Sequence, residues 1–104
     1  MRKIKSSLKK KYFVPVVRGQ LNKLLKMARI DCDFKQLEVS KELGLANAQY
    51  LSNIERGLCA PSMETVLALA KIYKIVPNKI IDVMISDYNQ ALEQKIRSIN
   101  KNFK

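Results

Sequence analysis

Two glycines and two prolines divide this chain into segments with helical spacing. Gly44 and Gly57 each follow apolar residues that recur every three or four positions, and Pro61 and Pro77 each precede another such run. Glycine readily adopts the left-handed conformation that ends many helices, and proline is well tolerated in the first turn of a helix. Because the 104 residues include only three glycines and three prolines, this pattern predicts an all-α fold made of short helices.

The apolar spacing predicts five helices around one small core. Their expected ranges are residues 15–30, 34–43, 47–56, 62–73 and 78–86. Asn47 and Ser62 are the expected N-caps of the third and fourth helices, because their side-chain oxygens can accept a backbone N–H. A chain of this length has room for one such core and for a short extension at each end. The expected compact domain therefore spans residues 15–86.

The C-terminal segment, residues 87–104, is predicted to form an amphipathic helix with one apolar stripe. The stripe starts at the end of the fifth helix and continues in steps of three and four through Ile85, Tyr88, Leu92, Ile96, Ile99 and Phe103. Such a stripe needs a partner surface. Two roles remain open: the stripe packs back on the same domain, or it forms the contact of a homodimer.

The N-terminal segment, residues 1–14, is predicted to be a basic arm. Six of the first eleven residues are lysine or arginine and none is acidic, within a chain whose formal net charge is +11. Lysine and arginine that neutralise phosphates release counterions, so a basic arm on a mildly basic domain favours nucleic-acid binding. The alternative is that the arm only increases solubility.

The composition argues against metal chemistry, catalysis and membrane insertion. The chain has no histidine, and its two cysteines, Cys32 and Cys59, lie too far apart in the sequence to form a local zinc motif. It contains no Gly-rich phosphate loop and no cluster of carboxylates. We therefore expect no cofactor and no enzymatic activity. Each apolar run is interrupted by charges or proline, so we expect a soluble, cytoplasmic protein.

Three stretches carry a family pattern in one register. They are the runs Gln36 to Gly44, Tyr50 to Gly57, and Pro61-Ser62. This sequence resembles the XRE, or lambda-repressor/Cro, helix-turn-helix family over about residues 16–84. The resemblance implies a five-helix lambda-repressor-like domain, and a sequence-specific double-stranded DNA-binding regulator of transcription that acts as a repressor.

The resemblance also assigns positions within the two central helices. The family opens its second helix with Gln, here Gln36, followed three and four positions later by an apolar and a small residue, here Val39 and Ser40. It often pairs an Arg late in helix one with the Glu of the third helix. The resemblance therefore implies an ion pair between Arg29 and Glu55.

The same resemblance places the DNA-reading side chains on the outer face of the helix from Asn47 to Arg56. Base contacts are expected from Ala48, Gln49, Ser52 and Asn53. Backbone contacts to phosphate or sugar are expected from Lys35, Gln36, Asn47, Tyr50 and Arg56. Gln and Asn can each make a bidentate contact to adenine. The segment from Gly44 to Glu55 is one residue longer than the common family pattern, so the reading position can shift by one.

The expected partner is double-stranded DNA with a palindromic operator, bound by a homodimer, because one short helix reads only a few base pairs. A second interpretation keeps the predicted fold but assigns the protein a different function. Relatives of this fold also serve as antitoxins, which bind a toxin protein and their own operator.

Overall fold

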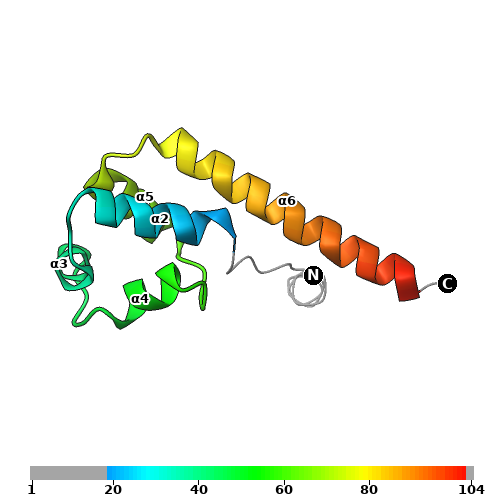
Figure 1. The fold of residues 1–104 in the computed structure, drawn as a ribbon, viewed down its shortest axis with the longest axis horizontal. Coiled ribbons are helices and arrows are strands. Elements are labelled where there is room, and N and C mark those ends of the chain that lie inside the picture. The colour runs from blue at the N-terminus through cyan, green and yellow to red at the C-terminus, as the bar shows by residue number, and fades with distance from the viewer. Residues whose placement is uncertain (1–18, 103–104) are drawn as a thin grey trace, which may run out of the picture.

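The computed structural model describes residues 19–102, which form five helices and no strand (Figure 1). The helices are α2 (Gln20–Asp31), α3 (Gln36–Glu42), α4 (Gln49–Glu55), α5 (Met63–Tyr73) and α6 (Pro77–Asn102). The predicted all-α, lambda-repressor-like fold is confirmed. The basic arm (1–14), residues 15–18 and Phe103 lie outside the described residues. The first helix begins at Gln20 and not at residue 15 as predicted, because Gly19 is extended and stands at the N-cap of α2. None of the helices within 19–102 is long and apolar enough to cross a membrane.

One core holds the helices together, with α2 in contact with α4, α5 and α6. The core side chains come from all five helices at the helical spacing seen in the sequence. They are Leu25, Val39, Leu51, Ile54, Val66, Leu69, Ala70, Tyr73 and Ile80. Completely burying one such aliphatic side chain contributes roughly 1.5–3 kcal/mol, so this core can fix the relative positions of the short helices.

Three helix ends follow the predicted signals. Gly44 and Gly57 stand just after α3 and α4 with φ of +78° and +72°, the left-handed region in which glycine avoids the strain of a side chain. Ser62 is the N-cap of α5, and its Oγ accepts a hydrogen bond from the N–H of Thr65 at 3.2 Å. These stops give α3 and α4 their length of seven residues each.

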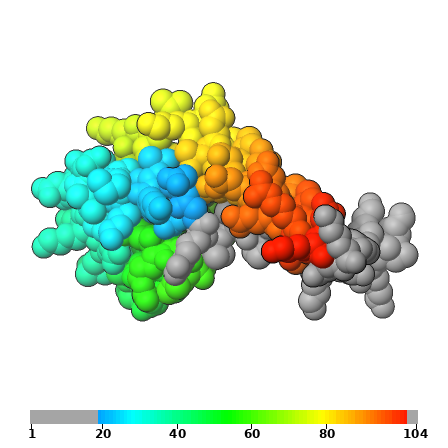
Figure 2. All heavy atoms as spheres, turned by 45° about the vertical axis from the view of Figure 1, so that its right-hand side comes forward, coloured from blue at the N-terminus to red at the C-terminus, as the bar shows by residue number. Residues whose placement is uncertain are grey.

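Helix α6 is one uninterrupted helix of 26 residues. It begins at Pro77, one residue before the predicted start, and the boundary expected after residue 86 falls inside it. The predicted fifth helix and C-terminal helix are therefore a single element, because no glycine or proline separates them. Its first part packs on α2 and α5, and its last part extends away from the other helices (Figures 1 and 2).

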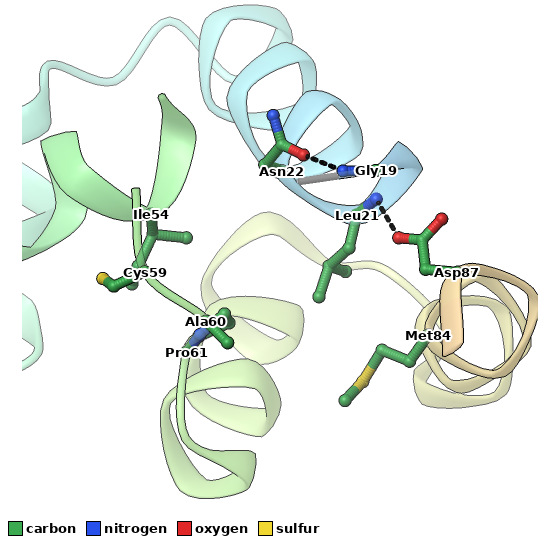
Figure 3. A pocket seen from close by; sticks show the side chains of 9 residues that line it. All are labelled: Gly19, Leu21, Asn22, Ile54, Cys59, Ala60, Pro61, Met84 and Asp87. Carbon is green, nitrogen blue, oxygen red and sulfur yellow. Dashed lines mark hydrogen bonds between the residues drawn. The ribbon is translucent and has the colours of Figure 1, made fainter. Parts of the chain in front are cut away.

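Asp87 fixes α6 to the first turn of α2. Its two carboxylate oxygens accept hydrogen bonds from the N–H groups of Gln20 and Leu21, each at 2.9 Å (Figure 3 draws the Leu21 bond). These N–H groups belong to the first turn of α2 and have no partner within that helix. Gly19 makes this approach possible, because a Cβ there would lie 2.6 Å from the carboxylate. The start of α2 is thus capped by a residue from the other end of the chain.

Candidate nucleic-acid interface

Helices α3 and α4 form a helix-turn-helix at the end of the molecule farthest from the C-terminus (Figure 1). They contact each other, and Ser40 of α3 is completely buried. A small residue at this position lets two helices approach closely. Its Oγ has no hydrogen-bond partner among the described residues, which indicates that size rather than hydrogen bonding matters here.

The inner side of α4 is held by a buried carboxylate. Glu55 is 5% exposed, and Arg29 Nε and Nη2 donate to its Oε2 and Oε1 at 2.7 and 3.1 Å. The same guanidinium donates from Nη1 to the carbonyl of Phe34 at 2.8 Å. The hydrogen bond to Glu55 raises the pKa of Arg29. The pair implied by the resemblance is therefore present, and it joins α2, the α2–α3 connection and α4.

Two further amides complete this network. Gln36 Nε2 donates to Glu55 Oε1 at 2.9 Å. The Gln36 side chain, which was predicted to contact DNA phosphate, therefore uses one of its amide hydrogens within the protein. Asn22 Nδ2 lies 3.4 Å from the carbonyl of Glu55, and its Oδ1 accepts the N–H of Gly19 at 2.8 Å. The sequence did not single out Asn22, because an asparagine in the first turn of a helix is ordinarily solvent-exposed.

Tyr73 lies behind this network at the end of α5. It is 4% exposed, and its hydroxyl has no hydrogen-bond partner within residues 19–102. Burial, followed by the nearby negative charge of Glu55, raises the pKa of this phenol. The phenol therefore stays neutral well above the pH at which an exposed tyrosine ionises.

The outer side of α4 carries the expected reading residues. Gln49 is exposed and Asn53 half-buried, one helical turn apart, and Gln49 Nε2 donates to Asn53 Oδ1 at 2.9 Å. This bond aligns the two amides on the same face of the helix. Five of the predicted residues line one open concavity between α3 and α4: Gln36, Asn47, Ala48, Gln49 and Ser52.

The start of α4 differs from the prediction. The helix begins at Gln49 with Ala48 at the N-cap position, rather than at Asn47. Asn47 stands in the preceding turn, where its Oδ1 accepts the N–H of Gln49 at 2.9 Å. The additional residue between Gly44 and Glu55 is thus accommodated in the turn, and the capping oxygen comes from one position earlier.

The remaining predicted residues are distributed around this surface. Lys35 is exposed at the N-cap of α3, and Arg56 is exposed at the C-cap of α4. Tyr50 is half-buried, and its hydroxyl accepts the N–H of Ser62 at 3.3 Å. Tyr50 therefore connects α4 to the start of α5, and only its hydroxyl proton is left for an outside acceptor.

The helix-turn-helix family matches residues 25–77, which run from the middle of α2 to the start of α6 and include both helices of the motif. The chain belongs to the XRE, or lambda-repressor/Cro-like, helix-turn-helix family. The predicted family and its DNA-binding domain are confirmed. Proteins of this helix-turn-helix family are DNA-binding regulators and not enzymes, in agreement with the sequence analysis.

One relative of this helix-turn-helix protein is the cryptic phage CTXphi transcriptional repressor RstR of Vibrio cholerae. The two are 32% identical over 71 residues, which cover 68% of this chain and 63% of RstR. The chain thus spans less than two thirds of its relative. No solved structure matches this chain.

Proposed function

We propose that this protein is a sequence-specific repressor of transcription that reads the major groove of duplex DNA with the outer face of α4. The observation that supports this most is the division of α4 into a side fixed by Arg29 and Glu55 and an open side carrying Gln49 and Asn53. A reading helix needs such a division, because its bases are selected only if its orientation is fixed. The similarity to a phage repressor agrees with this role.

The chemistry of the reading face favours adenine and thymine. Gln49 and Asn53 each carry one acceptor and two donor hydrogens, which can match the N6 and N7 edge of adenine. Their mutual hydrogen bond holds the amides close to one another before DNA arrives. Ala48 offers a methyl group for thymine. Ser52 adds a short hydroxyl in the same concavity as Gln49.

Contacts to the DNA backbone would come from the rim of this face. Lys35 and Arg56 are exposed at either end of the helix pair, and Asn47 lies in the turn between the two helices. Gln36 and Tyr50 each keep hydrogens that the hydrogen bonds within the protein do not use. These groups position the protein, whereas the face of α4 selects the sequence.

Two copies would bind together. One seven-residue helix reads only a few base pairs, and a two-fold symmetric pair doubles the contacts on a palindrome. A homodimer on a palindromic operator therefore accounts for specific affinity without an additional domain.

Selection of bound duplexes from a random pool at physiological salt tests this proposal. The native protein should recover a palindrome rich in A·T pairs at the read positions. The double variant Gln49→Ala/Asn53→Ala should lose that motif, with about 1–3 kcal/mol of discrimination removed per bidentate contact.

The matched control is Gln90→Ala/Gln94→Ala, which removes two exposed amides from α6. It should keep the motif. If the native protein binds DNA only in a salt-sensitive manner without sequence preference, the repressor proposal is wrong. Binding of a protein partner such as a toxin would then be the better interpretation.

A further inference from the structure

The exposed part of α6 carries an apolar stripe whose spacing is symmetric about Leu92. From Ile85 to Ile99 the apolar residues Ile85, Tyr88, Leu92, Ile96 and Ile99 follow in steps of 3, 4, 4 and 3. Ile81 and Phe103 continue the symmetry in the sequence, each eleven positions from Leu92. The order of steps is therefore the same from either end of the helix.

We propose that two copies of this chain pair through α6 in an antiparallel arrangement, with the two-fold axis at Leu92. In this register Ile85 meets Ile99 of the second copy, Tyr88 meets its Ile96, and the two Leu92 side chains meet each other. Every apolar residue of the stripe faces an apolar residue, as an isologous contact requires. This inference rests on the proposed binding of DNA by a dimer and specifies its geometry.

The burial of α6 shows that the stripe and the domain-facing side are different faces. Ile80 and Asp87 are buried against the domain, whereas Ile85, Tyr88, Ile96 and Ile99 are 53, 42, 48 and 38% exposed. A helical segment of about 15 residues is only marginally stable in water without a packing partner. The part of α6 beyond Asp87 therefore gains its stability if a second helix covers the stripe.

Charge favours the antiparallel direction. Residues 77–92 of α6 carry one lysine and two aspartates, and residues 93–102 carry one glutamate and three lysines or arginines. A parallel pair places the two basic segments side by side, and like charges repel. An antiparallel pair keeps the two basic segments at opposite ends of the pair, and also opposes the two helix dipoles.

The length of α6 matches the repeat of DNA in the same arrangement. Ile80 anchors α6 in the core, and Leu92 lies twelve residues further along, which corresponds to about 18 Å of helix. A two-fold axis at Leu92 then separates the two core anchors by about 36 Å along the helix pair, close to one turn of B-DNA. In a parallel pair the anchors would lie only about 8–10 Å apart.

Disulfide cross-linking in the full chain distinguishes the two directions. Both native cysteines are first removed by Cys32→Ser and Cys59→Ser. In this background the Ile85→Cys and Ile99→Cys proteins are prepared separately, and they are also co-expressed with a tag on one of them so that the mixed dimer can be identified. The antiparallel register places each Ile85 about 21 Å from its own symmetry mate but next to Ile99 of the second copy. We expect the mixed disulfide at least tenfold above either self-disulfide. Gln94→Cys, on the side of α6 opposite the stripe, is the control for chance collisions and should not cross-link.

Leu92→Asp in the otherwise native chain provides a second measurement that needs no cysteine. It places two carboxylates at the two-fold axis, and sedimentation should show at least a hundredfold weaker dimerisation. Self-disulfides at both Ile85→Cys and Ile99→Cys would indicate a parallel pair and overturn the proposal. Absence of every cross-link, together with a Leu92→Asp protein that still dimerises, would also overturn it.

These outcomes separate the pairing from the proposed function. If the cross-links contradict the antiparallel pair while the protein still selects a palindrome, the DNA-reading role stands and only this interface fails. If the antiparallel cross-links form but no duplex sequence is selected, the pairing stands and the repressor proposal fails.

Discussion

The two sides of α4 are built in opposite ways. On the inner side Leu51, Ile54 and Glu55 are buried, and Glu55 is joined to two other helices by Arg29 and Gln36. On the outer side the Gln49 side chain donates a hydrogen bond to Asn53, and among the described residues neither amide is joined to another helix. The inner side therefore sets the orientation of the helix, and we expect substitutions on the outer side to leave the fold unchanged.

The carboxylate of Glu55 has a role that an apolar residue could not take. A buried ion pair adds little net stability, because removing both charges from water offsets most of their attraction. Its directional hydrogen bonds, however, fix how α4 is rotated about its axis relative to α2 and α3. We infer that this network serves the positioning of the reading face more than the stability of the domain.

The largest effect is expected when the inner side is broken by Arg29→Met. Glu55 would then remain buried with Gln36 as its main side-chain donor, and an uncompensated buried charge costs about 3–5 kcal/mol. Urea unfolding should show this decrease in the free energy of unfolding. The matched control Lys26→Met removes an exposed base from the same helix and should change stability by no more than about 0.5 kcal/mol.

The double variant Arg29→Met/Glu55→Met sharpens the distinction between stability and positioning. With both charges removed, stability should return to near the native value or above it. Affinity for the selected duplex should remain reduced, because the directional bonds are missing. Full recovery of both properties would show that the network does not position α4.

A smaller effect is expected at Gln36 of α3, which is hydrogen-bonded to Glu55 and is also a proposed phosphate contact. Gln36→Ala removes one hydrogen bond to the charged Glu55, which costs roughly 1.5–3 kcal/mol before correction for partial exposure, and it also removes a proposed phosphate contact. Gln36→Glu should lower stability further, since two carboxylates would then adjoin. Thermal unfolding and duplex binding measure the two consequences, with Gln94→Ala on α6 as the control. A Gln36→Ala protein with native stability and lower DNA affinity would place this residue wholly on the reading side.

The sequence predicted most of the helix ends that depend on one or two neighbouring residues. Gly44, Gly57 and Ser62 end or begin helices where expected, since left-handed φ values and N-cap hydrogen bonds depend on one or two residues. The N-cap of α4 is Ala48, one residue after the predicted Asn47, because Asn47 makes its capping hydrogen bond from within the turn and not as the N-cap of the helix.

Contacts between distant segments were harder to derive. The sequence does carry a signal for Asp87, which shares a core-facing stripe with Ile80, Met84 and Ala91, at steps of four, three and four. A carboxylate at such a position needs donors, but the sequence does not show that these are the N–H groups of Gln20 and Leu21. Only the packing of α6 on α2 brings them together.

The smallest effect is expected for Tyr73→Phe, which tests whether the buried hydroxyl behind the Glu55 network contributes to the stability of the domain. The hydroxyl of Tyr73 is buried without a partner among the described residues, so its removal at pH 7 should leave stability unchanged or raise it by up to about 1 kcal/mol. Urea unfolding at pH 7 measures this difference.

Alkaline conditions give a second readout, because the pKa of Tyr73 lies above its ordinary value of 10.0 in the folded protein. The unfolded chain releases this proton near pH 10 while the folded protein retains it, so this contribution to stability is complete below that pH and is lost as the pH rises above it. Unfolding measured at pH 7 and just above pH 10 should therefore show a smaller loss for Tyr73→Phe than for the native protein. An equal loss in both proteins would mean that the pKa of Tyr73 is not raised and that its hydroxyl is accessible to solvent. A strongly destabilised Tyr73→Phe at pH 7 would mean that the hydroxyl is hydrogen-bonded and belongs to the network around Glu55.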